Sequence, residues 1–254
     1  NHVGTRRFHF NGAVTGTGKI QIGGGGTNTE FGSTYDGTNQ NGIEIVGNNV
    51  NIVSNVADNG TFLASGKSLT QNAGTTGGAT TINGANTLKG DIVITDKPVT
   101  LTVNKNQSAI GTITMGAGDL KLAAADGVTT IAFADSSGKT WGAGSLVITG
   151  AQDNEVSVGT SSSGLTAAQI LKTTLNGSDV VLNANGKIAA LNVVTTTFEG
   201  SDDTDYLWST EANWSTGTPT ANTKVVLKSN LVVDSSQEIG QLKVSGLVSG
   251  NIEV

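Results

Sequence analysis

Short runs of alternating apolar and polar residues, each closed by Gly, Asn or Asp, dominate the sequence and limit the folds open to it. Alternation with a period of two turns one set of side chains inward and the other toward solvent. Val, Ile and Thr fill these runs, as pleated strands favour, while Gly, Asn and Asp tolerate the positive φ angles of tight turns. The pattern predicts an all-β fold, with strands over 19–22, 42–46, 49–53, 91–95, 99–103, 110–115, 119–122, 128–133, 145–149 and 155–158.

The spacing of the predicted strands separates two β architectures. Over residues 1–130 only a few turn residues separate one strand from the next. This favours a β-solenoid, right-handed and β-helix-like, in which each coil consists of several short strands. Stacked Asn and Thr in aligned turns would add side-chain ladders between coils. A β-sandwich usually has longer strands with turn signals every ~8–12 residues. Because no strict repeat period is visible, β-sandwich modules remain the alternative.

The chain divides into three predicted regions. Residues 1–130 form a Gly/Asn/Thr-rich, solenoid-like region, residues 131–195 a β-module with a short helix and a hairpin, and residues 196–254 a C-terminal β-module. The last region contains Trp208 and Trp214 near its start. Its predicted strands lie over 224–228, 231–233 and 239–244.

One short helix interrupts the β pattern, over residues 165–175. Thr166 and Gln169 have the spacing of a capping box, in which each side chain satisfies a backbone N–H at the helix start. Leu165, Ile170, Leu171 and Leu175 make an apolar stripe, and Asn176-Gly177 ends the helix. A hairpin follows, with strands over 179–182 and 187–191.

Charge and composition exclude several classes of partner. Net charge is −6, the only arginines are Arg6 and Arg7, and the lysines are scattered singly. A nucleic-acid-binding protein needs a cationic stripe that releases counterions from phosphates, and an anionic membrane surface would repel this chain. No run of about 18 apolar residues is present to span a bilayer. The absence of Cys removes disulfides, thiolate metal sites and thiol nucleophiles. We expect neither nucleic-acid binding nor membrane insertion.

Two stretches resemble segments of bacterial surface proteins. Residues 133–138 (Phe-Ala-Asp-Ser-Ser-Gly) and 164–170 (Gly-Leu-Thr-Ala-Ala-Gln-Ile) are similar to a module of large secreted surface proteins, in which a strand pair, a helix and a hairpin recur. Residues 207–219 (Leu-Trp-Ser-Thr-Glu-Ala-Asn-Trp-Ser-Thr-Gly-Thr-Pro) resemble the element that opens units of autotransporter-associated β-strand repeats. The earlier part is similar in texture to autotransporter passengers and filamentous-haemagglutinin-like adhesins. The resemblance implies an exported surface protein and brings no catalytic residues.

The two histidines, His2 and His9, both lie near the N-terminus. A Ser-His-Asp triad would have to use this end of the chain. In a strand over 3–10, His9 shares a face with Arg7, while Phe8 and Phe10 share the other. We expect a strand or arm that pairs with another edge rather than a catalytic site.

A β-helix enzyme that cleaves polysaccharides is the alternative enzyme class. A lyase needs a cationic group beside a uronate, and the chain has no Arg beyond Arg7 and no Lys cluster. A glycoside hydrolase needs two facing carboxylates ~5–9.5 Å apart. The spacing of the residues selects no pair among the candidates Asp91, Asp119, Asp126 and Asp135. We therefore predict no catalytic residues and no enzyme activity.

Acidic side chains offer one weak metal site. Asp202, Asp203 and Asp205 could ligate Ca²⁺ together with Glu199, because calcium prefers carboxylate oxygens. The stretch lacks the glycine-spaced loop of an EF-hand or of a nonapeptide calcium repeat, so a solvated acidic loop is favoured and no metal or cofactor is predicted. Asp36-Gly37 and Asp153-Asn154-Glu155 are interpreted as turns.

Glycines and tryptophans offer two further possibilities. The run 23–26 (Gly-Gly-Gly-Gly) does not precede a helix, so it is interpreted as a flexible turn rather than a phosphate-binding loop. Trp141, Trp208 and Trp214 could stack on sugar rings. Because aromatic residues make up only 4% of the chain, we expect these side chains to fill the core instead.

Both terminal segments, over 3–10 and 239–254, have few charges and no Pro, the features that normally protect exposed strand edges. We expect at least one of them to pair with a strand of an adjacent protomer or module. The predicted function is therefore structural: a subunit or segment of an extracellular bacterial surface assembly, such as a filament, surface layer or adhesin stalk. It would form a homo-oligomer or polymer, and glycans or a cell surface are further candidate partners. A monomeric carbohydrate-binding adhesin module is the alternative.

Overall fold

The structure is a computed structural model that describes residues 7–23, 28–72, 78–191, 194–198, 208–215, 218, 223–227 and 241–244. The chain divides into two compact units, residues 1–190 and 191–254. The predicted regions 1–130 and 131–195 therefore lie almost wholly within one unit, and the division falls close to the predicted boundary at 195/196.

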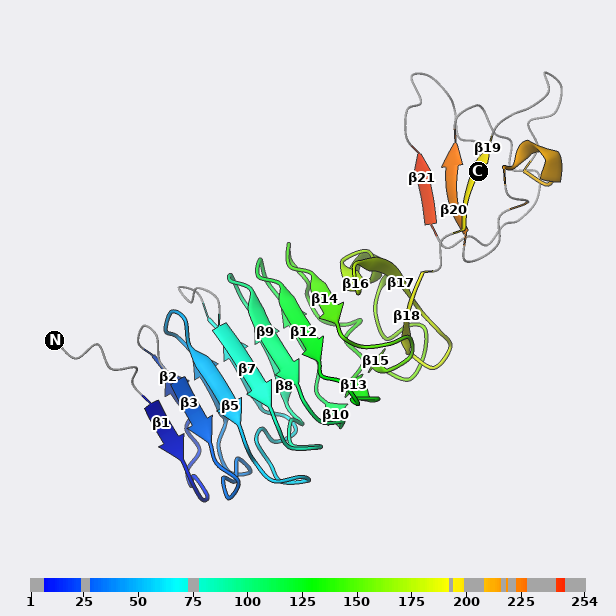
Figure 1. The fold of residues 1–254 in the computed structure, drawn as a ribbon. Coiled ribbons are helices and arrows are strands. Elements are labelled where there is room, and N and C mark those ends of the chain that lie inside the picture. The colour runs from blue at the N-terminus through cyan, green and yellow to red at the C-terminus, as the bar shows by residue number, and fades with distance from the viewer. Residues whose placement is uncertain are drawn as a thin grey trace. The chain divides into compact units, whose positions relative to one another are not determined.

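The first unit is a β-solenoid, as predicted, and not a β-sandwich. Its largest sheet has the strand order β1-β3-β5-β7-β9-β12-β14-β16-β17-β18, and the strands from β1 to β16 are all parallel (Figure 1). These strands are β1 (Arg7–Phe10), β3 (Asn28–Phe31), β5 (Asn51–Ser54), β7 (Gly78–Ile82), β9 (Val99–Val103), β12 (Leu120–Ala124), β14 (Leu146–Thr149), β16 (Thr173–Leu175), β17 (Ser178–Leu182) and β18 (Ile188–Ala190).

Two smaller parallel sheets complete the coils. The five-stranded sheet has the order β11-β8-β6-β4-β2, and the three-stranded sheet the order β10-β13-β15. Their strands are β2 (Ile20–Ile22), β4 (Gly42–Ile45), β6 (Ser68–Gln71), β8 (Asp91–Ile94), β11 (Ile113–Met115), β10 (Gln107–Ile110), β13 (Ile131–Phe133) and β15 (Val156–Val158). Because neighbours in sequence mostly belong to different sheets, each coil winds around one interior.

The coils differ in length, which explains why no repeat period is visible in the sequence. Asn28, Asn51, Ala79, Thr100 and Lys121 stand in register in the largest sheet, although they are 23, 28, 21 and 21 positions apart. Turns absorb these differences while the strands keep their register.

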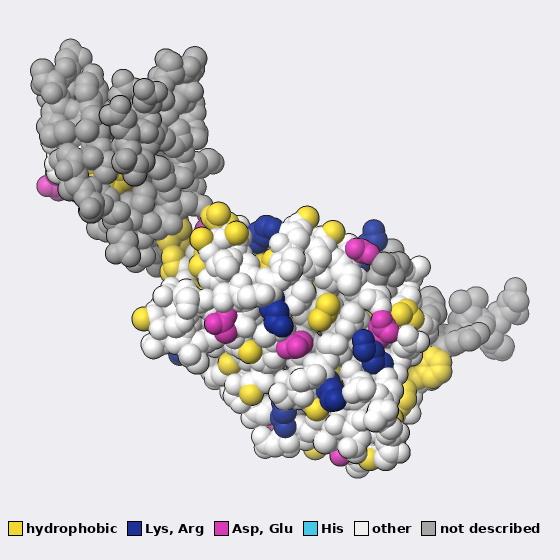
Figure 2. Space-filling model, turned by 180° about the vertical axis from the view of Figure 1, so that it is seen from behind, with side chains coloured by type: hydrophobic (Ala, Val, Ile, Leu, Met, Phe, Trp, Pro, Cys, Tyr) yellow, Lys and Arg dark blue, Asp and Glu magenta, His cyan; other side chains and the backbone are white. Residues whose placement is uncertain are grey.

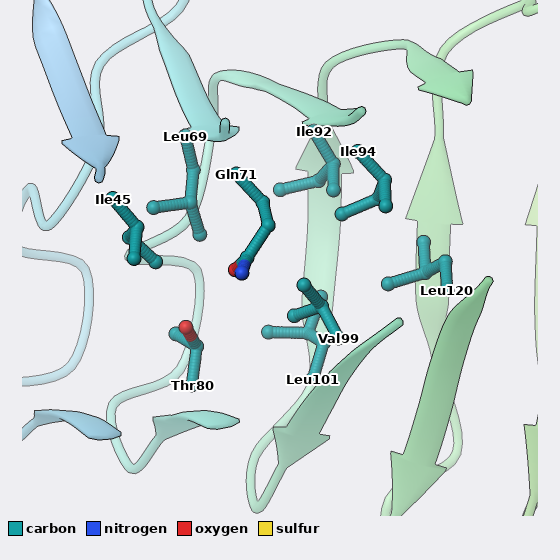
Figure 3. A pocket seen from close by; sticks show the side chains of 9 residues that line it. All are labelled: Ile45, Leu69, Gln71, Thr80, Ile92, Ile94, Val99, Leu101 and Leu120. Carbon is teal, nitrogen blue, oxygen red and sulfur yellow. The ribbon is translucent and has the colours of Figure 1, made fainter. Parts of the chain in front are cut away.

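One apolar core fills the interior of the solenoid. Strands β7 and β9 alternate buried and half-buried residues, as their apolar alternation predicts. Some inward positions are polar: Gln71 and Thr80 point among Ile and Leu side chains toward a cavity of about 10 Å³ (Figure 3). This volume is at the lower limit for one water molecule.

The helix is shorter than predicted. Helix α1 spans Ala167–Ile170, and both hydrogen bonds of the capping box between Thr166 and Gln169 are present. The prediction of helix over 173–175 was wrong, because these residues form β16, paired with β14. The β-branched Thr173 and Thr174 lose rotamer freedom in a helix and fit a pleated strand. The predicted apolar stripe is also wrong at Leu171, which is 73% exposed.

The single strand predicted over 110–115 was also wrong. The chain turns a corner at Gly111-Thr112, so that β10 and β11 belong to different sheets. A Cβ atom at Gly111 would lie 2.7 Å from the backbone nitrogen of Asp91, so only Gly lets this corner pack on the preceding coil.

The hairpin predicted over 179–191 is confirmed, because β17 and β18 pair antiparallel with Val180 opposite Ala190. The second unit contains a parallel sheet of β19 (Val194–Phe198), β20 (Thr223–Leu227) and β21 (Gln241–Val244), and a short 3₁₀ helix, η1 (Glu211–Asn213). The predicted strand over 231–233 lies outside the described residues.

Candidate functional site: the N-terminal face of the solenoid

The two ends of the solenoid differ. At the C-terminal end, the hairpin β17–β18 follows β16 in the largest sheet, Lys187 bridges Ser157 of β15, and Trp141 bridges Met115 of β11. At this end, the outermost parallel strand of each sheet (β16, β15 and β11) therefore has a neighbouring segment that pairs with it. At the N-terminal end, β1 pairs with β3 and β2 pairs with β4, and no other described strand pairs with β1 or β2. One edge of each strand thus carries backbone groups without a described β partner.

Aromatic residues of β1 belong to the interior. Phe8 stands in register with the buried Thr29, and Phe10 with the buried Phe31, so both phenylalanines face inward. The rings of Phe10 and Phe31 stack, with centroids 5.0 Å apart. Phe8 is nevertheless 49% exposed, because the part of the chain that the structure describes places no coil over it.

Val14 and Ile20 extend this apolar surface, since both are half-buried and pack against the core. We call Phe8, Phe10, Val14 and Ile20, with the edges of β1 and β2 that have no described β partner, the N-terminal face. This face resembles the contact surface between two successive coils, because it combines apolar side chains with strand edges.

His9 points away from the interior, on the opposite side of β1 from Phe8. Its Nε2 atom lies 4.0 Å from Oε1 of Glu30, and both side chains are about half exposed. Glu30 also accepts a 2.7 Å hydrogen bond from the side chain of Asn55. His2 lies outside the described residues.

The four acids considered for hydrolysis lie on different elements. Asp91 begins β8, Asp119 precedes β12, Asp126 lies in the turn after β12, and Asp135 follows β13. Three of them accept hydrogen bonds that fix turns or neighbouring coils, as follows.

Asp91 Oδ1 accepts from the backbone N–H of Thr112 at 2.6 Å, and Asp119 Oδ1 accepts from the N–H of Ser145 at 2.9 Å. Both carboxylates thus join two coils. The Ser137 hydroxyl and N–H donate to Asp135 at 2.7 and 2.9 Å, which lowers the pKa of that carboxyl. These three carboxylates therefore have a structural role, since each accepts a hydrogen bond from a main-chain N–H group of a turn or a neighbouring coil.

The structure describes the acids of the predicted turns, Asp36 and Asp153, but not the calcium candidates. Asp36 accepts from the Thr38 hydroxyl and N–H, which lowers the pKa of its carboxyl, and Asp153 accepts from the N–H of Ala190 at 2.7 Å. Among the described residues, no group of three or more His, Asp or Glu side chains could hold a metal ion. The calcium candidates Glu199, Asp202, Asp203 and Asp205, and the glycines at 24–26, lie outside the described residues.

Two of the three tryptophans, Trp208 and Trp214, are buried, as expected, whereas Trp141 is only partly covered. Trp208 is 2% exposed and Trp214 5%, and their rings lie 4.8 Å apart in an edge-to-face arrangement. Trp214 Nε1 donates to the Trp208 carbonyl at 2.8 Å. Trp141 is half-buried and donates to the carbonyl of Ile113 across the coils at 3.1 Å. Trp208 and Trp214 therefore do not form an exposed platform for sugar rings.

Side-chain amides form a ladder along the largest sheet. Asn55 donates to Glu30 at 2.7 Å, Asn83 to Asn55 at 2.6 Å, and Asn104 to Asn83 at 2.6 Å. Stacked Asn residues were expected from the turn composition, but the irregular coil lengths conceal which residues align. The ladder ties four successive coils together on the outside of the solenoid.

Surface charge is dispersed. On the face seen in Figure 2, Lys side chains are interspersed with Asp and Glu over a largely uncharged surface. No helix of the described residues is both long and apolar enough to cross a membrane. Comparison with protein-family models, with curated proteins and with solved structures gave no match.

Proposed function

We propose that this chain is a structural segment of an extracellular bacterial surface assembly, a filament, surface layer or adhesin stalk, and that its N-terminal face pairs with strands of an adjacent protomer. The observation that carries the proposal is Phe8, an inward-facing residue of β1 that remains 49% exposed beside strand edges for which the described residues supply no partner. A monomeric protein normally protects such an edge with charges, Pro or a covering element.

The energetics favour a strand pair as the occupant of this face. A coil added to β1 and β2 would satisfy main-chain N–H and C=O groups that otherwise bind water, and would cover Phe8. Complete burial of a Phe side chain contributes about 1.5–3 kcal/mol, so covering the exposed half of Phe8 contributes about 1 kcal/mol. The inward alternation of β1 selects the register of the added strand, because a slip of one residue would turn the inward-facing side chains of that added strand outward.

The resemblance to autotransporter-associated repeats and filamentous-haemagglutinin-like adhesins supports a surface location. The Asn ladder supports a rigid, load-carrying role, since it links coils by side chains in addition to the backbone. The rival function, sugar binding through tryptophans, is less well supported because Trp208 and Trp214 are buried. A hydrolase is less well supported because Asp91, Asp119 and Asp135 anchor turns.

The experiment compares the purified chain with Phe8→Glu by negative-stain electron microscopy and light scattering. We expect concentration-dependent particles larger than one chain for the wild type, and single chains for Phe8→Glu, because a carboxylate would have to be buried without a partner. Leu171→Glu is the matched control: Leu171 is also exposed, but lies after α1, away from the N-terminal face. It should assemble as the wild type does. A wild type that stays monomeric at all concentrations, or a Phe8→Glu variant that still assembles, contradicts the proposal.

A further inference from the structure

A groove of about 540 Å³ lies over the three-stranded sheet of the solenoid, separate from the N-terminal face. Its floor contains the outward-facing Ala109 of β10, Ala132 of β13 and Ser157 of β15. These side chains are small, so a ligand can approach the backbone of the sheet closely. The volume lies within the range of ligand-binding clefts, about 300–1,000 Å³.

A β-bulge shapes this floor. Gln107 stands opposite Ile131 and Ile110 opposite Phe133, so both Ser108 and Ala109 oppose one residue, Ala132. Both residues of the bulge are exposed and line the groove, whereas the next pair, β13 and β15, is regular. Bulges bend a strand and redirect side chains, and they are frequent beside binding sites.

Several polar groups in the groove are available to a ligand. Within the described residues, the ammonium groups of Lys89 and Lys187 make no ion pair or hydrogen bond, and the hydroxyls of Ser157 and Thr160 make no hydrogen bond. Two lysines outside the groove do donate hydrogen bonds: Lys67 to the side chain of Asn41 at 2.9 Å, and Lys172 to the main-chain carbonyls of Trp141 and Gly142. Both ammonium groups and both hydroxyls are therefore free to contact a ligand in the groove.

The charged side chains that line the groove favour an anionic ligand that also carries hydroxyl groups. Two ammonium groups and one carboxylate, that of Asp135, line the groove, so its local charge is positive in a chain whose net charge is −6. Hydrogen bonds from Ser137 hold Asp135 in its ionised form, ready to accept from hydroxyl groups. A ligand with carboxylates at intervals and hydroxyls between them would match this arrangement.

The length of the groove points to a chain rather than a single sugar. Lys89 belongs to the coil before β10, and Lys187 to the segment bridged to β15. Four spacings between neighbouring strands separate these positions, or roughly 19 Å. An extended peptide fits less well, because β13 is already paired with both β10 and β15 and offers no free main-chain edge to a further strand.

We propose that this groove binds an acidic oligosaccharide, with Lys89 and Lys187 contacting carboxylates of the sugar chain and the floor of Ala109, Ala132 and Ser157 admitting its rings. This inference does not depend on the proposed assembly, because all of these residues belong to a different side of the solenoid from Phe8.

The test is isothermal titration of the purified chain with three probes of similar length: an oligogalacturonate, a neutral cello-oligosaccharide and oligoglutamate. We expect the oligogalacturonate to bind, its affinity to fall with added salt, and the other two to bind at least tenfold more weakly. Lys89→Gln and Lys187→Gln should each weaken binding up to about fivefold, as expected for partly exposed charge contacts. Lys121→Gln is the control, since Lys121 is exposed on β12 of the largest sheet.

A second pair of variants tests the floor. Ala132→Trp should abolish binding, whereas Ala123→Trp, at a half-buried position on β12, should leave it unchanged. Circular dichroism establishes that both variants are folded, and the Lys variants decide the matter if Ala132→Trp is not. The proposal is overturned if no oligosaccharide binds, if the neutral sugar or oligoglutamate binds as tightly as the oligogalacturonate, or if folded Ala132→Trp binds like the wild type. The titration is repeated with Phe8→Glu, which should bind normally whether or not it assembles.

Discussion

Two substitutions that exchange a buried polar side chain for an apolar one should have opposite effects on stability. Gln107 is fully buried, and its side chain makes four hydrogen bonds. Its oxygen accepts from the N–H groups of Thr87 and Leu88 at 3.0 and 3.1 Å, and its nitrogen donates to the carbonyl of Gly84 at 2.7 Å and to that of Lys105 at 3.1 Å. Thr80 is also fully buried, but its hydroxyl has no hydrogen-bond partner among the described residues.

The magnitudes follow from these contacts. Gln107→Leu keeps a similar volume but leaves two buried N–H groups unsatisfied, each at a cost of about 1–3 kcal/mol. The Gly84 carbonyl keeps a donor, the Thr87 hydroxyl at 3.2 Å. We therefore expect the free energy of unfolding to fall by about 3 kcal/mol. Thr80→Val keeps the β-branched shape and removes an unsatisfied hydroxyl, so the free energy of unfolding should rise by about 1 kcal/mol.

Urea unfolding followed by circular dichroism measures both changes, and an unchanged slope shows that the same surface is exposed on unfolding. Amide hydrogen exchange supplies a local measurement: the N–H groups of Thr87 and Leu88 should lose protection in Gln107→Leu, while amides of distant coils should not. Exposed Lys105→Gln is the control and should change neither quantity. An unchanged or raised stability in Gln107→Leu would refute the reasoning, as would a loss of more than about 1 kcal/mol in Thr80→Val.

Three further substitutions or titrations test individual features. Asn83→Ala removes two ladder hydrogen bonds and Asn104→Ala one, so the free energy of unfolding should fall by about 2 and 1 kcal/mol, and equal losses would contradict the ladder. Burial raises the pKa of Tyr35 to about 12, so the stability that its neutral phenol provides is complete below about pH 10 and is lost as pH rises toward 12. Spectrophotometric titration of the tyrosines in a Tyr206→Phe background measures this pKa, and an ordinary value would be inconsistent with burial. Gly42→Ala should cost about 3 kcal/mol, because φ is +116° and a Cβ would crowd the neighbouring coil, whereas Gly66→Ala, at φ +74° in open space, should cost about 1 kcal/mol by thermal unfolding.

Much of the fold was predictable from local pattern. The alternation over 99–103 and the hairpin over 179–191 appear as expected, because inward and outward residues of a strand differ in polarity. The capping box at Thr166 was also recognisable, since it depends on two residues three positions apart. The predicted helix over 173–175 was wrong because pairing with β14 decides that segment, and no local signal contains this pairing.

The candidate sites were less predictable. That Phe8 and Phe10 share a face follows from alternation, but the exposure of Phe8 follows from the absence of a described coil over it. The acids considered for catalysis looked equivalent in sequence, and only the coil stacking shows that Asp91 and Asp119 accept main-chain N–H groups of the following coil. The groove depends on a bulge at Ser108-Ala109, which no spacing in the sequence indicated.

By itself the sequence determined that this chain forms many short strands, because residue polarity and backbone preference act over only a few positions. The tertiary structure decided which strands align, that the coils have unequal lengths, and which faces remain open, because these depend on contacts between residues 21–28 positions apart along the largest sheet. In the solenoid, those long-range contacts convert a set of similar runs into a shared apolar interior, an N-terminal face that no described coil covers, and a polar groove over the three-stranded sheet.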